Sequence, residues 1–271
     1  MADDSVTLER RGQVALMTLT RPHKKNALDE GMWRALDAAL DDVALNLPRA
    51  LVVTGAGESF CAGVDVSLDN PLTAKQMQGI QDRDRDAVHG VLARMRRTVD
   101  RLVDLPIPVI GAINGLAYGG GAEIATRFDL RVVDPAAQIC FSEVRLGLMP
   151  DLGGGVALAR LLGPARAADL ILTARRFDGT EAVALGWATR LSAAGACLDE
   201  ALGMADVIAK NGPRAVRYAL RVLRAHGEIS ASAGLELELD VATDLILSGE
   251  CLHGVTAMFS KSEPTFPDIV E

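Results

Sequence analysis

Three consecutive glycines with a glutamate close behind them are the residues of this chain best suited to chemistry. Residues 119–121 are all glycine and Glu123 follows, at the end of the stretch 107–123, which reads I-P-V-I-G-A-I-N-G-L-A-Y-G-G-G-A-E. The apolar, β-branched start of this stretch predicts a buried strand, and the residues after the glycines predict the start of a helix. A glycine turn that opens a helix presents unpaired backbone N–H groups and the positive end of the helix dipole. Such a turn suits a ligand that carries or develops negative charge, and Glu123 lies within reach of it.

A purely structural interpretation of the same pattern stays open at this point. Gly-rich turns from strand to helix are common, and a glutamate in a first helical turn is often only a partner of the helix dipole. A phosphate loop is not indicated, because no G-x-x-x-x-G-K-[ST] motif occurs. A dinucleotide site is not indicated either, because the three glycines lack the G-x-G-x-x-G spacing.

Two further acids lie in the stretch 141–155, which reads F-S-E-V-R-L-G-L-M-P-D-L-G-G-G. Glu143 has mostly apolar neighbours in sequence. If it has no role in chemistry, the structural interpretation is a surface salt bridge with Arg145. Asp151 precedes three more glycines that are predicted to open a helix. The structural interpretation of Asp151 is therefore that it is the N-cap residue of that helix, which its position suits.

The composition limits the classes of partner. The chain has 271 residues, 49% of them hydrophobic and 24% charged, as expected of a globular protein, and its formal net charge is −8. This acidic balance argues against nucleic acid or an anionic membrane as the main partner. No run of about 18 apolar residues predicts a membrane span. The acidic N-terminal sequence has no apolar signal core and the four cysteines are scattered, so we expect a cytoplasmic protein with reduced thiols.

No motif indicates a metal or a serine nucleophile. The sequence contains neither H-E-x-x-H nor G-x-S-x-G. The run 21–26, R-P-H-K-K-N, is either a solvated loop or a handle for a ligand phosphate.

Hydrophobic periodicity predicts a mixed α/β core followed by helices. Strands are expected at 14–19, 50–54, 107–113 and 130–133, and helices at 28–45, 91–103, 165–173, 180–185, 198–209, 213–225, 235–247 and in the amphipathic tail 251–264. Residues 68–90 are polar and have no clear apolar face. We expect them to form a surface segment that covers or gates a site.

Taken together, several short motifs in the right order resemble the enoyl-CoA hydratase/isomerase (crotonase) family. They are R-P-x-x-x-N-A-L at 21–28, F-C-A-G-V-D-V at 60–66, I-N-G-x-A-x-G-G-G-A-E at 113–123, F-S-E-V-R-L-G-L-M-P at 141–150, A-L-G-W-A at 184–188 and F-S-K-S-E-P at 259–264. The resemblance implies a crotonase-like α/β fold, a spiral of repeated ββα turns. It also implies a core over 1–195 with the acyl-CoA site, and a helical C-terminal region over 196–271 that supports a homotrimer, often a dimer of trimers.

The resemblance also assigns roles at the site. Two backbone N–H groups, those of Val64 and Gly120, would hold the thioester oxygen of an acyl-CoA and stabilise developing enolate charge as an oxyanion hole. The residues that match substrate or coenzyme A contacts are Ala62, Val64, Asp65, Val66, Ser67, Gly120 and three lysines, Lys24, Lys25 and Lys261. Lys261 would reach the site from its own tail or from that of a neighbouring subunit. No separate cofactor and no metal are implied, because coenzyme A is part of the substrate.

Glu123 and Glu143 match the two acids of the hydratases. There they hold a water over the double bond of a 2-enoyl-CoA. One acid removes a proton from the water and the other protonates the α-carbon. Two positions depart from that pattern: Ser142 replaces a proline and Asp151 replaces a glycine. An acid at position 151 resembles members that move double bonds. The alternatives are therefore a hydratase, a 3-enoyl- or dienoyl-CoA isomerase that uses Glu143 or Asp151, and an acyl-CoA-binding member with little turnover.

Overall fold

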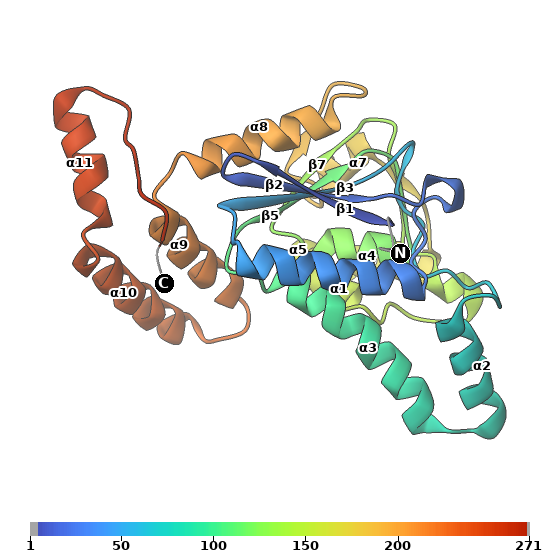
Figure 1. The fold of residues 1–271 in the computed structure, drawn as a ribbon. Helices are drawn as coiled ribbons and strands as arrows, with labels where there is room; N and C mark the ends of the chain where they lie inside the picture. The colour runs from blue at the N-terminus through green and yellow to red at the C-terminus, as the bar shows by residue number, and fades with distance from the viewer. Residues whose placement is uncertain (1–4, 270–271) are drawn as a thin grey trace.

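Two β-sheets surrounded by helices make up the body of the molecule (Figure 1). The structure is a computed structural model that describes residues 5–269. The larger sheet has the order β1-β2-β3-β5-β7-β10 and contains β1 (Val6–Arg11), β2 (Val14–Leu19), β3 (Ala50–Gly55), β5 (Val109–Ile113), β7 (Leu130–Val133) and β10 (Arg190–Leu191). The smaller sheet has the order β4-β6-β8-β9 and contains β4 (Ser59–Cys61), β6 (Leu116–Tyr118), β8 (Gln138–Cys140) and β9 (Phe177–Asp178).

The order of the elements along the chain makes a spiral. Strands β3, β5 and β7 of the larger sheet are each followed by a strand of the smaller sheet, β4, β6 and β8, and then by helices. All pairs from β2 to β10 in the larger sheet are parallel, and only β1 runs antiparallel to its neighbour. This repetition confirms the predicted spiral of ββα turns.

Helices cover both faces of the larger sheet, so its strands are apolar on both sides. In β2, Val14 and Leu16 face a cluster with α8, whereas Ala15 and Met17 face the main core. In Figure 1 α8 lies on one side of the sheet and α1, α4 and α5 lie on the other. The helices of the first two thirds of the chain are α1 (Glu30–Leu45), α2 (Pro71–Asp82), α3 (Arg85–Val103), α4 (Gly120–Arg127), α5 (Gly154–Leu162), α6 (Pro164–Thr173) and α7 (Gly179–Leu185).

The C-terminal part is helical, as predicted. It contains α8 (Cys197–Ala209), α9 (Pro213–Ala225), α10 (Ala231–Leu247) and α11 (Glu250–Ser260). Helix α8 packs against the larger sheet, whereas α9, α10 and α11 extend to one side of it (Figure 1). Arg224 of α9 forms a bidentate ion pair with Asp129, with N–O distances of 2.8 and 2.7 Å, which ties this extension to the start of β7. The predicted division between 195 and 196 stays a prediction.

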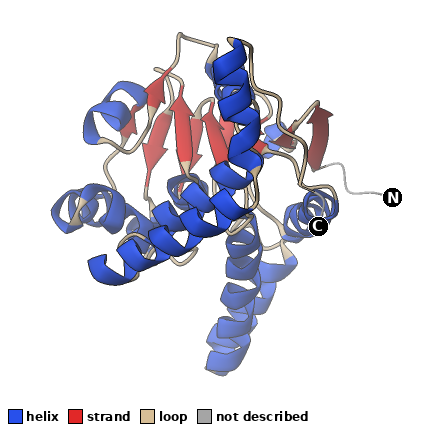
Figure 2. Ribbon diagram, turned by 90° about the vertical axis from the view of Figure 1, so that its left-hand side faces the viewer, coloured by secondary structure: helices blue, strands red, loops and turns tan. Residues whose placement is uncertain are grey.

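Residues 68–90 fold into regular structure that the sequence pattern did not predict. They form α2 and the first turns of α3, two helices that pack against each other and project from the body of the molecule (Figures 1 and 2). Both helices begin at a side-chain N-cap, Asn70 for α2 and Asp84 for α3. These two helices are therefore stabilised by their N-caps and by packing against each other. They do not need the wide apolar stripe of a helix that packs on the core.

None of the helices within residues 5–269 combines the length and the apolar character that crossing a membrane would require. The cytoplasmic location stays a prediction.

Candidate active site

Two loops from neighbouring turns of the spiral bring two backbone amides together. The loop after β4 carries Val64, and the turn after β6 leads into α4, whose first residue is Gly120. A Cβ atom placed on Gly120 would lie 3.6 Å from the backbone nitrogen of Val64. Neither amide donates a hydrogen bond to any of residues 5–269. Both N–H groups of the predicted oxyanion hole are therefore neighbours and free of protein acceptors.

The third glycine of the run is required by close packing. A Cβ atom on Gly121 would lie 2.2 Å from the carbonyl oxygen of Cys61, at the end of β4. Only a residue without a side chain allows α4 to approach this strand so closely. The approach brings the N-terminus of α4 against the loop that carries Val64.

Glu123 lies in the first turn of α4 and is buried, with 1% of its surface exposed. Its Oε1 accepts a hydrogen bond from the N–H of Asp151 at 3.2 Å, and its Oε2 accepts from the N–H groups of Leu152 and Gly154, each at 2.9 Å. Burial, and next the charge of Glu143, raise the pKa of Glu123 to about 8, although the Gly154 N–H acts to lower it. Glu123 therefore tends to keep its proton at neutral pH.

Glu143 opens the short 3₁₀ helix η2 (Glu143–Leu146) and is 8% exposed. Neither of its carboxyl oxygens has a hydrogen-bond partner among residues 5–269, and burial raises its pKa. The alternative of a surface salt bridge with Arg145 is wrong, because Arg145 donates to the carbonyl of Ala174 at 2.6 Å instead. A buried carboxyl group without a protein partner is unusual and typical of a functional site.

Asp151 is the most exposed of the three acids. The alternative that it caps α5 is wrong, because the N-cap residue is Gly153, which makes no side-chain cap bond. The Glu123 carboxyl group instead binds the amides at this helix start. Asp151 is an exposed residue, but partial desolvation of its carboxyl group raises its pKa.

One pocket of about 110 Å³ collects these groups. All three acids line it, together with Gly120 and Val64. The other lining residues are glycine, serine, glutamine and apolar side chains: Ala62, Gly63, Val66, Gln76, Met95, Gly119, Ser142, Leu146, Leu148 and Met149. The pocket can therefore bring a carbonyl oxygen to two amides while three carboxyl groups flank the neighbouring atoms.

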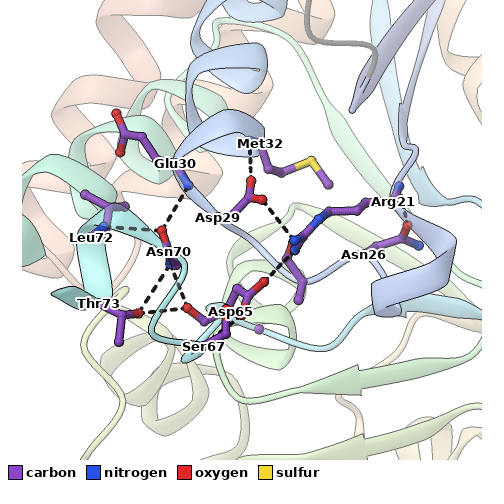
Figure 3. A network of polar contacts seen from close by, with 12 residues as sticks. Arg21, Asn26, Asp29, Glu30, Met32, Asp65, Ser67, Asn70, Leu72 and Thr73 are labelled. Atoms are coloured by element: carbon purple, nitrogen blue, oxygen red, sulfur yellow. Dashed lines mark hydrogen bonds and ion pairs between the residues drawn. The ribbon is translucent and has the colours of Figure 1, made fainter.

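The strip 64–67 is held by a network of charged and polar groups (Figure 3). Arg21 pairs with Asp65 at 2.7 Å and with Asp29 at 3.0 Å. Burial acts to raise the pKa of Asp65, but hydrogen bonds from Arg21 and Ser67 outweigh it and lower the value to about 2. Asn70 donates to the Asp65 carbonyl and Ser67 donates its N–H to the Asp65 carboxylate. Asp65 was predicted to bind substrate, and its side chain serves here to hold the loop.

The predicted lysines are exposed, and the pocket lining does not include them. Lys24 ends the turn η1 (Pro22–Lys24), and the carbonyl of Lys25 accepts a hydrogen bond from Ala62 N at 2.9 Å. This pair therefore adjoins the strip at 62–67. Lys261 caps the end of α11, which Figure 1 shows far from α2 and α4. Its contact with coenzyme A, from its own tail or from that of a neighbouring subunit, stays a prediction.

Sequence reasoning missed the groups that hold the site from behind. Arg21 and the buried Asn26 belong to the motif R-P-x-x-x-N-A-L, which was the available signal for them. Arg127 donates to the Leu152 carbonyl at 3.0 Å, and no signal in the sequence indicated this contact. Within the described residues, no group of three or more His, Cys, Asp or Glu side chains gathers as a metal site would.

Comparisons with known proteins agree with this geometry. The sequence model of the enoyl-CoA hydratase/isomerase family matches residues 9–269. The "Probable enoyl-CoA hydratase" of Rhizobium meliloti is 34% identical over 269 residues, which are 98% of this chain and 99% of that protein. Enoyl-CoA hydratase EchA19 of Mycobacterium tuberculosis is 33% identical over 266 residues, 96% of this chain and 95% of that protein.

Solved structures give the same result. The crystal structure of enoyl-CoA hydratase from Bacillus anthracis has a TM-score of 0.87 and 29% sequence identity, and the match covers 97% of this chain and 98% of that one. The family match spans nearly the whole sequence, and the relatives align from end to end. This chain belongs to the enoyl-CoA hydratase/isomerase family.

Proposed function

We propose that the protein is an enoyl-CoA hydratase, which adds water across the double bond of a 2-enoyl-CoA thioester in the degradation of fatty acids or related acyl groups. The observation that carries the proposal is the pair Glu123 and Glu143. Glu143 is buried, neither of its carboxyl oxygens has a hydrogen-bond partner within residues 5–269, and its charge helps raise the pKa of Glu123. Two neighbouring carboxyl groups of this kind titrate as a coupled pair that shares one proton.

In the proposed reaction the thioester oxygen accepts hydrogen bonds from the amides of Val64 and Gly120. These donors stabilise the enolate that forms as water attacks the β-carbon, and each contributes roughly 3–4 kcal/mol in the transition state. The pair of glutamates holds the attacking water. One carboxyl group removes its proton, and the other donates a proton to the α-carbon when the enolate collapses. Coenzyme A is part of the substrate, so the reaction as proposed uses no further cofactor.

A double-bond isomerase is the second candidate, and Asp151 favours it. Asp151 lines the same pocket, and it does not cap the helix that follows. A third acid beside the acyl chain would carry a proton from one carbon to another without addition of water. In that reaction Glu143 or Asp151 would remove the proton from a 3-enoyl- or dienoyl-CoA.

A spectrophotometric assay separates the candidates. The protein is mixed with crotonyl-CoA and with longer 2-enoyl-CoAs, and the absorbance of the conjugated thioester is followed. Loss of this absorbance supports the hydratase. No loss together with conversion of a 3-enoyl-CoA rejects the hydratase in favour of the isomerase, and tight binding without either reaction leaves an acyl-CoA-binding member.

We also propose that the active form is a homotrimer or a dimer of trimers. Large apolar side chains are exposed on α9, α10 and α11, among them Leu223 at 70%, Leu239 at 63% and Phe259 at 78%. Exposed apolar surface of this extent is typical of an interface between proteins.

A further inference from the structure

The loop 151–154 is bound on both sides by one helix. On its front, the N–H of Leu152 donates to Glu123 at 2.9 Å, and on its back the carbonyl of Leu152 accepts from Nη1 of Arg127 at 3.0 Å. Glu123 and Arg127 stand four residues apart on α4 and therefore share a helix face. They bind the N–H and the carbonyl of the same residue, so α4 holds the loop at Leu152 by two hydrogen bonds.

Arg127 is itself oriented by α3. Its guanidinium forms an ion pair with Asp100 at 2.7 Å, and its side chain is only 13% exposed. Asp100 forms a second ion pair, with Arg96 of the same helix, at 2.8 Å. Gly153 makes room for this arrangement: its φ is +91°, and a Cβ atom there would lie 3.1 Å from Cζ of Arg96 and 3.3 Å from Nε of Arg127. The positive φ favours glycine at this position, and a Cβ atom would crowd the side chains of both arginines.

The gripped residue also touches the other half of the site. Leu152 is 1% exposed, and its Cδ1 would lie 3.0 Å from a Cβ atom on Gly120. The neighbouring amides of Asp151 and Gly154 complete the set of three that bind Glu123. A shift of Leu152 would therefore move the N–H groups that bind Glu123 and also the carboxyl group of Asp151. It would at the same time disturb the packing of Leu152 against Gly120 of the oxyanion hole.

We propose that Arg127 is a positioning residue of this active site, which holds the Leu152 carbonyl so that the amides of loop 151–154 remain on the Glu123 carboxyl group. This inference rests on the proposed function for its catalytic meaning. Loss of the Arg127 side chain frees the loop, and the N–H groups that favour ionised Glu123 move away. Glu123 then titrates at a higher pH than in the wild type.

Other charged groups around Glu123 also affect its pKa. Glu143 of η2 and Asp151 of the loop both raise its pKa. Behind the loop lie Arg127 of α4 and the pair Arg96 and Asp100 of α3. A control must therefore separate loss of the hydrogen bond from loss of a positive charge. Arg96 provides it, because its guanidinium also lies against Gly153 but donates to Asp100 and not to Leu152.

The test uses the full chain with ¹³C-labelled glutamate carboxyl groups, and the signal of Glu123 is assigned by its absence in Glu123→Gln. In Arg127→Met the NMR titration midpoint of Glu123 is expected to rise by about one pH unit, as loss of a hydrogen bond to a carboxylate predicts. Arg96→Met is expected to move it by less than half as much. An unmoved midpoint in Arg127→Met, or an equal shift in Arg96→Met, would overturn the proposal.

A milder variant covers the case in which Arg127→Met does not fold. Arg127→Lys keeps the charge on a single ammonium nitrogen but loses the planar fork that serves Leu152 and Asp100 together. We expect faster hydrogen exchange at the amides of Leu152 and Gly154, by at least about tenfold, in this variant. Exchange unchanged within twofold would overturn the proposal. Both readouts are independent of turnover, so they decide the role of Arg127 even if the protein hydrates no enoyl-CoA.

Discussion

At the scale of single residues, three carboxyl groups in one pocket have different surroundings. Glu123 receives three backbone N–H groups, Glu143 receives no hydrogen bond from residues 5–269, and Asp151 is exposed at the pocket. Burial raises the pKa of each of them. Under the proposed function these different surroundings would suit different tasks, because a carboxyl group that keeps its proton serves as an acid and one that loses it serves as a base.

Glu143→Gln is expected to lower kcat for a 2-enoyl-CoA by roughly 10²–10⁴-fold without loss of stability. The reason is that the buried carboxyl oxygens have no hydrogen bond in the described chain to lose, while the substitution removes a desolvated charge. Turnover and thermal unfolding of the two proteins provide the measurement, with the exposed Glu58→Gln as a control. A drop in melting temperature that parallels the loss of activity would argue for a structural role instead.

The pH dependence of kcat/KM has a definite sign. Since the pKa of Glu123 is raised to about 8, its proton is present at pH 7 and is lost as the pH rises through 8, so the rate should fall there. Asp151→Asn removes a charge that raises this pKa, and the alkaline limb should move to lower pH. A pH–rate profile measures both, and the exposed Asp82→Asn should leave the limb in place. Movement toward higher pH in Asp151→Asn would contradict the assignment.

At the scale of elements, α4 carries the site at its first turn and needs support at its last. The helix has only 8 residues, too few to be stable alone. Arg131 of β7 is fully buried and donates to the carbonyls of Ala125, Thr126 and Phe128 at the end of α4, and to that of Trp187. Burial lowers the pKa of Arg131 to about 10, so it stays charged at neutral pH.

Arg131→Met is expected to lower the free energy of unfolding by about 3 kcal/mol, because it leaves several buried carbonyl groups without a donor. Urea denaturation of the variant and the wild type measures the difference. Arg131→Lys should recover part of it, since one ammonium group reaches fewer carbonyls than a guanidinium fork. A change below about 1 kcal/mol in Arg131→Met would show that α4 does not depend on this contact.

The sequence predicted these elements unevenly. The glycine turn and the start of α4 were predicted correctly because both depend on neighbouring residues. The helices at 71–82 and 85–90 were missed, because their stabilisation comes from the caps Asn70 and Asp84 and from packing of α2 on α3. The N-cap interpretation of Asp151 failed because Glu123, 28 residues earlier, binds those amides instead.

At the scale of the whole molecule, the C-terminal helices are distinguished by exposed apolar side chains. On α10 and α11 they include Leu235 at 68%, Leu247 at 79% and Phe259 at 78%. These helices stand to one side of the sheets (Figure 1). In the proposed assembly, association of copies of the chain would bury these apolar faces.

Replacement of Met258 and Phe259 together by aspartate is expected to convert the proposed trimer into monomers, because two charges would have to be desolvated at its interface. Light scattering during gel filtration measures the mass at micromolar concentration. Leu45→Asp is the matched control, since Leu45 is 83% exposed but lies at the end of α1. A wild-type protein that is already monomeric would refute the proposed assembly.

The sequence by itself determined the family, the alternation of strands and helices, and the chemical groups of the site. Apolar periodicity and glycine turns are properties of neighbouring residues, so they can be recognised from the sequence alone. Only the tertiary structure decided which groups meet: it brought Val64 to Gly120, attached the amides of 151–154 to Glu123 and placed Arg127 behind them. Those contacts join separate turns of the spiral, and their energies depend on burial and distance, which no spacing along the chain encodes.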